Sequence, residues 1–176
     1  VYKRQVLING ASGGVGTFAV QIAKVFGAVV TAVCSPRNME LARSLGADHV
    51  IDYTKEDFTK SGKQYDLIIA ANGYHSLTDY QRALRPNGQY VMIGGTMAQV
   101  FEALLFGRMK SKDNQKMSHI MAQPSQKELA FVAGLLADGK IKPVIAKRYT
   151  LAQTAEAIRC VEEGHAQGKV VITVVE

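Results

Sequence analysis

A glycine-rich turn between an apolar run and a helical pattern constrains this sequence more than any other feature. Asn9-Gly10-Ala11-Ser12-Gly13-Gly14-Val15-Gly16 directly follows the apolar run that begins at Gln5. In a dinucleotide-binding turn one glycine permits the sharp bend, a second lets backbone N–H groups approach a pyrophosphate, and a third lets helix and strand pack closely. We assign these roles to Gly10, Gly13 and Gly16, and we include Ser12, Gly14 and Val15 among the candidate cofactor-binding residues. The diphosphate is expected at the helix N-terminus, where free N–H groups and the helix dipole favour negative charge.

Short apolar runs alternate with helical patterns over the first two thirds of the chain. We expect strands at Gln5–Asn9, Val29–Cys34, His49–Asp52, Tyr65–Ala70 and Gln89–Ile93, and a sixth near Met117–Ala122. This order is typical of βαβ units wound into a parallel sheet that is buried on both faces. The sequence therefore predicts an α/β Rossmann fold with a doubly wound, six-stranded parallel sheet.

The helix after the glycine-rich turn is indicated by a regular apolar spacing. The residues that recur at the spacing of one helix face are Val15, Phe18, Ala19, Ile22 and Phe26. We expect this stripe to pack on the sheet, and we expect Gly27 to end the helix.

The last part of the chain reads as strand, helix and strand, an order that need not extend the parallel sheet. Thr150 and Gln153 form a capping-box pattern, which predicts a helix start there. The closing segment Lys169–Val175 is too apolar for an exposed edge strand, so we expect a partner for it that can lie outside this chain. We divide the chain into a nucleotide-binding domain, residues 1–142, and a C-terminal segment, residues 143–176.

The end of the second expected strand bears on the choice of cofactor. NAD-dependent domains place an acid there to accept hydrogen bonds from the adenosine ribose, whereas this chain has Cys34-Ser35-Pro36-Arg37. A carboxylate would repel the 2′-phosphate of NADPH, but a hydroxyl and a guanidinium can bind it. The sequence therefore favours NADPH over NADH.

Composition argues against several other classes of function. The two cysteines and four histidines form no zinc-ligand spacing, so we expect no metal site. The net charge is +6, yet lysine and arginine are spread along the chain rather than gathered in a patch, which argues against nucleic acid.

No apolar run is long enough to span a bilayer, so we expect no membrane association and a cytoplasmic location. The N-terminus lacks both Met and a signal-peptide pattern, which indicates a piece of a longer protein.

Several motifs together resemble one known family. They are the turn Gly10–Gly16, the segment Arg43–Asp48 followed by Val50–Tyr53, the segment Leu84–Gly88 leading to Val91–Gly95, and Glu163–Ile172. Over nearly its whole length the chain resembles the cofactor-binding half of a medium-chain dehydrogenase/reductase, close to the zinc-independent quinone oxidoreductase branch.

The resemblance implies roles for particular positions. Ser35, Arg37 and Tyr53 match the residues that hold the 2′-phosphate in NADPH-using relatives, and a common downstream lysine falls near Asn38. Asn72 and Gly73 fall where relatives often have an acid and a glycine lining the cofactor groove. Ile93, Gly94 and Gly95 match the stretch beside the nicotinamide.

The resemblance also implies partners and a reaction. The sixth strand would pair with its twin in a homodimer, and residues 143–176 would return to a missing N-terminal catalytic domain. We expect an NADPH-dependent reductase that passes hydride to a quinone, an enone or another carbonyl substrate, inactive as this fragment alone and with its catalytic residues elsewhere. A zinc-dependent alcohol dehydrogenase, a non-catalytic NADPH sensor and, more distantly, a methyltransferase remain alternatives.

Overall fold

A parallel sheet with the strand order β3-β2-β1-β4-β5-β6 forms the centre of the molecule. The structure is a computed structural model that describes residues 3–71, 75–93, 113–119, 123, 125–164 and 166–174. The strands are β1 (Gln5–Asn9), β2 (Val29–Cys34), β3 (His49–Asp52), β4 (Tyr65–Ala70), β5 (Leu84–Met92) and β6 (Lys116–His119). All neighbouring strands run parallel, and the strand order reverses between β1 and β4. This is the doubly wound, six-stranded Rossmann fold that the sequence predicts.

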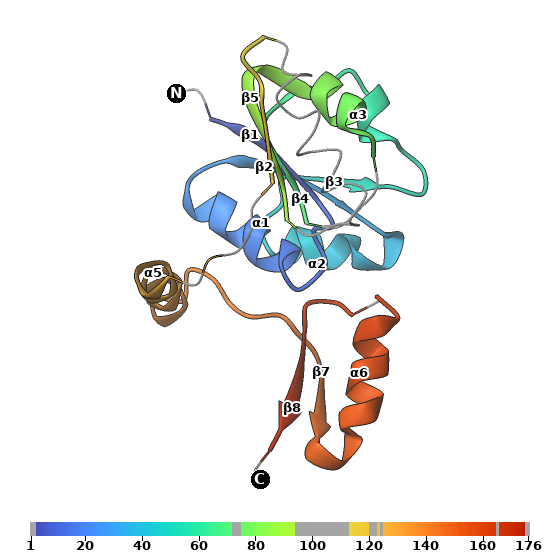
Figure 1. The fold of residues 1–176 in the computed structure, drawn as a ribbon, viewed down its shortest axis with the longest axis vertical. Helices are drawn as coiled ribbons and strands as arrows, with labels where there is room; N and C mark the ends of the chain where they lie inside the picture. Colours follow the sequence, from blue (N-terminus) through green and yellow to red (C-terminus); the bar gives the residue numbers. More distant parts are fainter. Residues whose placement is uncertain are drawn as a thin grey trace.

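Helices cover both faces of this sheet (Figure 1). The α-helices are α1 (Gly16–Val25), α2 (Met39–Ser44), α3 (Leu77–Arg82), α5 (Gln126–Ala137) and α6 (Thr154–Glu162). Short 3-10 turns are η1 (Pro36–Asn38), η2 (Phe58–Lys60) and η3 (Leu151–Gln153). Within the described ranges, no helix has the length and apolar character that crossing a membrane demands.

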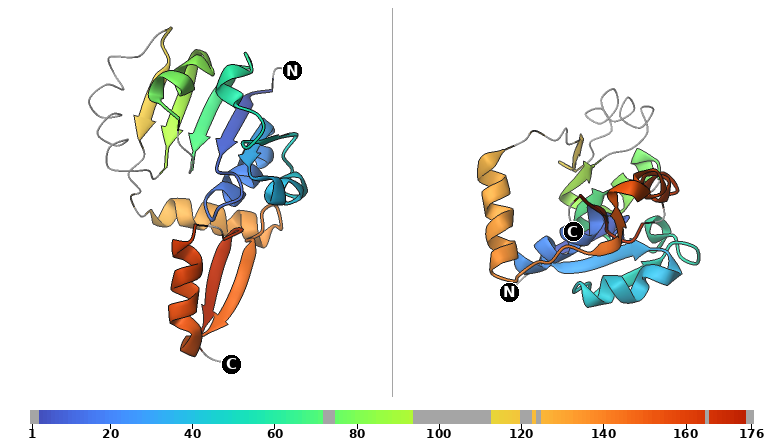
Figure 2. Two further views of the ribbon diagram at one scale, coloured as in Figure 1. Left: turned by 90° about the vertical axis from the view of Figure 1, so that its right-hand side faces the viewer. Right: turned by 90° about the horizontal axis from the view of Figure 1, so that it is seen from below.

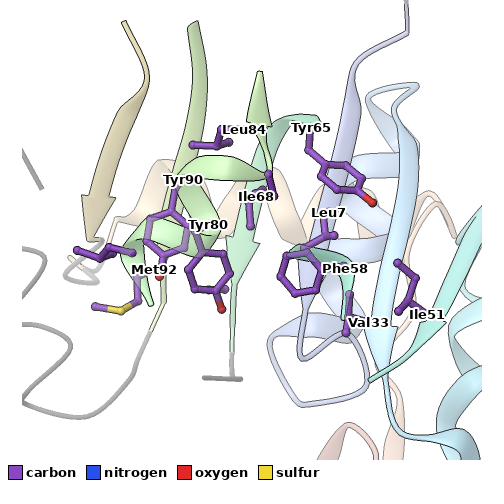
Figure 3. Packing of buried hydrophobic residues seen from close by; sticks show 13 residues of the cluster. Leu7, Val33, Ile51, Phe58, Tyr65, Ile68, Tyr80, Leu84, Tyr90 and Met92 are labelled. Carbon is purple, nitrogen blue, oxygen red and sulfur yellow. The ribbon is translucent and has the colours of Figure 1, made fainter. Parts of the chain in front are cut away.

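Two buried clusters form the core, one on each face of the sheet. Strand side chains alternate between the faces, so Val6 and Ile8 of β1 pack with α1 and α2, while Leu7 packs on the opposite side. On that opposite side Phe58 and Tyr80 approach Leu7 and Ile68 from η2 and α3 (Figure 3). Burial on both faces explains why the strands read as continuous apolar runs.

Two predicted strands have different bounds in the structure. The strand predicted at Gln89–Ile93 begins earlier, because Leu84 already pairs with Tyr65 before a register shift. The backbone is irregular inside this strand, where Asn87 has a φ of 61°. The sixth strand is Lys116–His119 rather than Met117–Ala122, and residues 120–122 lie outside the described residues.

The predicted face of α1 is wrong for most of its residues, although Ala19 packs against the core. Val15 and Phe26 are 44% and 71% exposed, and the predicted residues between them are only half-buried. The buried positions are instead Gly16, Thr17, Val20 and Gln21, so the helix is rotated away from the predicted stripe. Phe26, at the C-terminal end of the predicted stripe, contacts another helix: its ring stacks on Phe131 of α5 with 6.3 Å between the centroids.

The C-terminal strands form a separate two-stranded parallel sheet, β7 (Ile145–Thr150) with β8 (Lys169–Thr173). Together with α6 they extend away from the main sheet, on the side toward which its strand arrows point (Figure 1 and Figure 2). They do not extend the main sheet, which the sequence pattern left open. One partner of β8 therefore lies within this chain rather than outside it. The predicted helix start is present, since Gln153 Oε1 accepts from the Thr150 N–H at 3.1 Å.

Candidate functional site

A pocket of about 440 Å³ opens at the carboxyl ends of β1 and β2. It is lined by Asn9, Gly10, Ser12, Gly13, Val33, Cys34, Ser35, Arg37, Asn38, Tyr53, His75, Gly164 and Ala166. Residues from the ends of three parallel strands therefore meet segments that are distant in the sequence. In doubly wound sheets this edge, beside the point where strand order reverses, is where ligands bind.

The glycine-rich turn is tied to the neighbouring strand and closely packed on itself. Gly10 has a φ of 83°, a backbone conformation that favours glycine. The N–H groups of Gly10 and Ala11 both donate to the carbonyl of Val33, at 3.2 and 3.1 Å. A β-carbon at Gly16 would overlap the carbonyl oxygen of Gly10, so helix α1 can begin here only with glycine at that position.

Gly13 has no comparable reason to be glycine within the protein itself. Among the described residues, a β-carbon there would meet only the Gly10 carbonyl oxygen, at an ordinary 3.7 Å, and Gly13 itself lines the pocket. In the described part of the chain, the N–H groups of Ser12 and Val15 have no acceptor. A backbone without a side chain at Gly13, next to N–H groups that have no acceptor, is suited to a diphosphate, because diphosphates bind such loops through backbone N–H groups.

The end of β2 brings the predicted phosphate ligands to the same pocket. Ser35 is half-buried, Arg37 is exposed and Tyr53 is 60% exposed, and all three line the pocket. The nearby carboxylate, Asp52, is absent from the lining. It accepts from the N–H and hydroxyl of Thr54, at 2.9 and 2.7 Å, and these bonds hold its pKa below the usual range.

The thiol of Cys34 is buried at the base of this region. Burial, and secondarily the charge of Asp52, raises the pKa of the Cys34 thiol, which keeps the sulfur protonated and neutral. Among the described lining residues none is acidic, and Arg37 is the charged side chain. This lining is compatible with an anionic group.

Asn38 is one of the polar lining residues that sequence reasoning missed, together with Asn9 and His75. Asn38 was expected only as the position of an absent lysine, but its side chain is buried at the centre of the site. Its Nδ2 donates to Ser12 Oγ at 2.8 Å and to Ser35 Oγ at 3.0 Å, and its Oδ1 accepts from Gln167 Nε2 at 2.6 Å. A single amide thus joins the glycine-rich turn, the end of β2 and the C-terminal segment.

The C-terminal segment lies against the glycine-rich turn, which no sequence pattern indicated. The N–H of Gly168 donates to the carbonyl of Ser12 at 3.0 Å, and Gly168 forms a parallel bridge with Gly13. Gly164 and Ala166, from the same segment, line the pocket. The glycine-rich turn is consequently in contact with residues about 150 positions further along the chain.

An aromatic group lies behind the pocket. His75 contacts the rings of Phe58 and Tyr80 edge-on, at 4.8 and 5.7 Å between centroids. Asn9 Nδ2 donates to the Tyr80 hydroxyl at 2.9 Å, which connects this group to the end of β1. Burial raises the pKa of Tyr80 to about 12, so the hydroxyl stays neutral.

Some predicted site residues lie apart from the pocket or outside the described residues. Gly14, Val15 and Gly16 do not line it, and Ile93 follows β5 with its N–H donating to Ala70. The other predicted residues, Asn72, Gly73, Gly94 and Gly95, are outside the described residues. Across the described ranges, no group of three or more His, Cys, Asp or Glu side chains could hold a metal ion.

Comparison with known proteins identifies relatives over almost the whole chain. A family model described as zinc-binding dehydrogenase matches residues 45–172. A mitochondrial NAD(P)H oxidoreductase from Danio rerio is 36% identical over 99% of this chain and 50% of its own length. A chloroplast envelope quinone oxidoreductase homolog from Arabidopsis thaliana is 35% identical over 97% of this chain and 52% of its own.

Solved structures agree with these sequence relatives. The quinone oxidoreductase from Coxiella burnetii superposes with a TM-score of 0.84 and 26% identity, covering 98% of this chain and 53% of that one. The chain thus spans about half the length of the curated relatives it matches.

Proposed function

Because the chain belongs to the zinc-binding dehydrogenase family of the medium-chain dehydrogenase/reductase superfamily, we propose that it is the NADPH-binding part of a quinone- or enone-reducing enzyme. The relatives support a nicotinamide-dependent oxidoreductase domain, since one is named an NAD(P)H oxidoreductase and another a quinone oxidoreductase homolog. The choice of NADPH and of a quinone, an enone or a similar carbonyl acceptor is our proposal.

One observation carries the choice of NADPH: the pocket contains a hydroxyl and a guanidinium where a ribose-binding acid would exclude phosphate. Ser35 and Arg37 line the pocket directly after β2, and Tyr53 lines it after β3. The carboxyl group of Asp52 bonds to Thr54 instead of lining the pocket. A 2′-phosphate would find charge-assisted hydrogen bonds here without facing a like charge.

The remaining pocket residues would bind and orient the rest of the dinucleotide. Backbone N–H groups of the turn around Ser12 and Val15 would receive the diphosphate, and Gly13 would allow its approach. When bound, the nicotinamide supplies the hydride. The described residues contain no set of three metal ligands, so they do not fit zinc, and we assign no step to a metal.

We propose that the whole enzyme includes a further domain, because this chain spans about half the length of its curated relatives. We propose that residues 143–176 dock on an N-terminal catalytic domain, because the unit they form carries exposed apolar side chains, including Leu151, Ile158 and Val161. We also propose a homodimer through β6, which is an edge strand of the main sheet and pairs with β5 alone among the described residues. The chain by itself is expected to bind cofactor without turnover.

Calorimetric titration of the chain with NADPH and with NADH tests this proposal. We expect tighter binding of NADPH by about tenfold or more, as for a charge-assisted hydrogen bond of at least about 1.5 kcal/mol. Equal affinities, or tighter binding of NADH, would contradict the role given to Ser35 and Arg37. Absence of binding for both would contradict the cofactor role of the turn.

A further inference from the structure

We propose that Asn38 and Gln167 are paired positioning residues that make the Ser12 and Ser35 hydroxyls donate hydrogen bonds into the pocket, and so set its preference for a phosphate. The inference rests on the NADPH function proposed above. Neither side chain needs to touch the cofactor for this role. Gln167 does not line the pocket, whereas Asn38 does.

The direction of the hydrogen bonds around Asn38 carries the argument. A side-chain amide has a donating end and an accepting end. The donating Nδ2 of Asn38 faces both serine oxygens, at 2.8 and 3.0 Å, so each serine hydroxyl accepts from it. A hydroxyl that already accepts keeps its proton available to donate. The two serines therefore present O–H groups to the pocket.

Gln167 fixes which end of Asn38 faces the serines. Its Nε2 donates to Asn38 Oδ1 at 2.6 Å, and this bond holds the accepting end away from the serines. If the side-chain amide of Asn38 rotated by half a turn, the serine hydroxyls would donate to its Oδ1 and could no longer donate to a ligand in the pocket. The 2′-phosphate proposed beside Ser35 has only acceptor oxygens and would then lose a donor, whereas a ribose hydroxyl can donate as well as accept. Ser12 belongs to the turn proposed for the diphosphate, which both dinucleotides carry, so the Ser35 hydroxyl is the one that the affinity ratio reports.

Gln167 can exert this control because the backbone around it is held firmly. On its C-terminal side Gly168 donates to Ser12, and the N–H of Lys169 donates to Val144 at 2.7 Å. Gly168 is itself buried and bridges to Gly13. Because its backbone is fixed in this way, the C-terminal segment holds the Gln167 side chain in the position from which it orients the Asn38 amide.

The ratio of NADPH affinity to NADH affinity reports this role, because a merely structural defect would weaken both. The substitution Gln167→Glu replaces the donor by an acceptor of the same size, so Asn38 should turn its Nδ2 toward residue 167. We expect the affinity ratio to fall about tenfold, the scale of one charge-assisted hydrogen bond. Calorimetry with NADPH and NADH measures the ratio, and thermal unfolding checks the fold.

The added charge of Glu is separated from the turning of Asn38 by a double-mutant cycle. In an Asn38→Ala background no amide is present to turn, so Gln167→Glu should change the ratio less than about threefold. Gln167→Met adds no charge and removes the donor. It should lower the ratio about threefold in the otherwise unchanged chain, which gives a test independent of any Asn38 variant.

The outcomes separate this inference from the proposed function. A fall in the ratio for both Gln167 variants that depends on Asn38 supports the pairing. An NADPH preference that survives both variants, or an equal fall with and without Asn38, overturns the pairing and leaves the proposed function intact. A chain with no NADPH preference before any substitution overturns both.

Discussion

Gly16 lies so close to Gly10 that a side chain at Gly16 would overlap the Gly10 carbonyl oxygen. Gly13, three residues earlier, has space for a β-carbon at 3.7 Å from the same oxygen. The two glycines therefore serve different purposes within one turn. Gly16 is required by packing of the protein against itself, whereas Gly13 meets no such overlap among the described residues, and we propose that the approach of a ligand requires it.

Alanine at each position should separate these purposes. Gly16→Ala should lower the free energy of unfolding by about 1–3 kcal/mol, as for overpacking in a close-packed region. Gly13→Ala should change it by less than about 1 kcal/mol but lower dinucleotide affinity about tenfold or more. Chemical denaturation and calorimetry measure the two quantities. Unchanged binding by a folded Gly13→Ala chain would contradict a diphosphate at this turn.

Arg37 should contribute to NADPH binding and not to NADH binding. Arg37→Ala should weaken NADPH by about 1.5–3 kcal/mol, the range for a hydrogen bond to a charged group, with NADH little changed. Arg82→Ala is the matched control, because it removes the same charge from α3, where Arg82 pairs with Asp79 at 3.1 Å away from the pocket lining. If both variants lost the same NADPH affinity, the effect of Arg37→Ala would come from the change in net charge, and a specific contact of Arg37 with the 2′-phosphate would be contradicted.

The strand pattern of the sheet could be predicted from sequence because burial on both faces leaves a continuous apolar signal. The first four strands have the predicted bounds for this reason. Parallel strands also end at a common edge, so the clustering of Ser35 and Tyr53 follows from order along the chain alone. The family motifs then added the expectation of an oxidoreductase.

The face of α1 could not be predicted, because polar residues are buried on it. Gln21 donates to the carbonyl of Lys142 at 2.9 Å and accepts from its N–H at 2.8 Å, which satisfies a buried amide. No local pattern reveals a partner 121 residues away. The bond between Gln167 and Asn38 escaped prediction for the same reason, since it spans 129 residues.

Tyr80 should make stability sensitive to alkaline pH. Its folded pKa of about 12 lies above its ordinary value of about 10, so the fold favours the neutral hydroxyl. As pH rises from 10 to 12 the unfolded chain loses this proton first, and folding stability falls. The loss is about 1.4 kcal/mol at pH 11.

Comparison with Tyr80→Phe isolates that contribution. The variant leaves the buried Asn9 amide without its acceptor and should be about 1–3 kcal/mol less stable at pH 8. Urea unfolding at pH 8 and pH 11 should show the difference between the two proteins shrinking by about 1.4 kcal/mol, because phenylalanine does not ionise. A difference that stays constant with pH would contradict the raised pKa of Tyr80.

Gly168 tests whether the C-terminal segment is part of the cofactor site. It has a φ of +88°, and a β-carbon there would overlap the carbonyl oxygen of Val144. Gly139 has a similar φ of +66° at the end of α5, with open space around it. Alanine at either position meets the same backbone strain of about 1–2 kcal/mol, but only Gly168→Ala must also displace neighbouring backbone.

We therefore expect Gly139→Ala to bind both dinucleotides normally, and Gly168→Ala to bind both at least about fivefold more weakly, a loss of about 1 kcal/mol. The reason is that moving Gly168 breaks its bond to Ser12 and removes support from the turn that we propose as the diphosphate site. Titrations run well below the unfolding temperature of each variant keep folding out of the comparison. Normal affinity in a folded Gly168→Ala chain would contradict this expectation. It would mean that displacing the backbone at Gly168 does not change cofactor binding, because the turn keeps its conformation without support from the C-terminal segment.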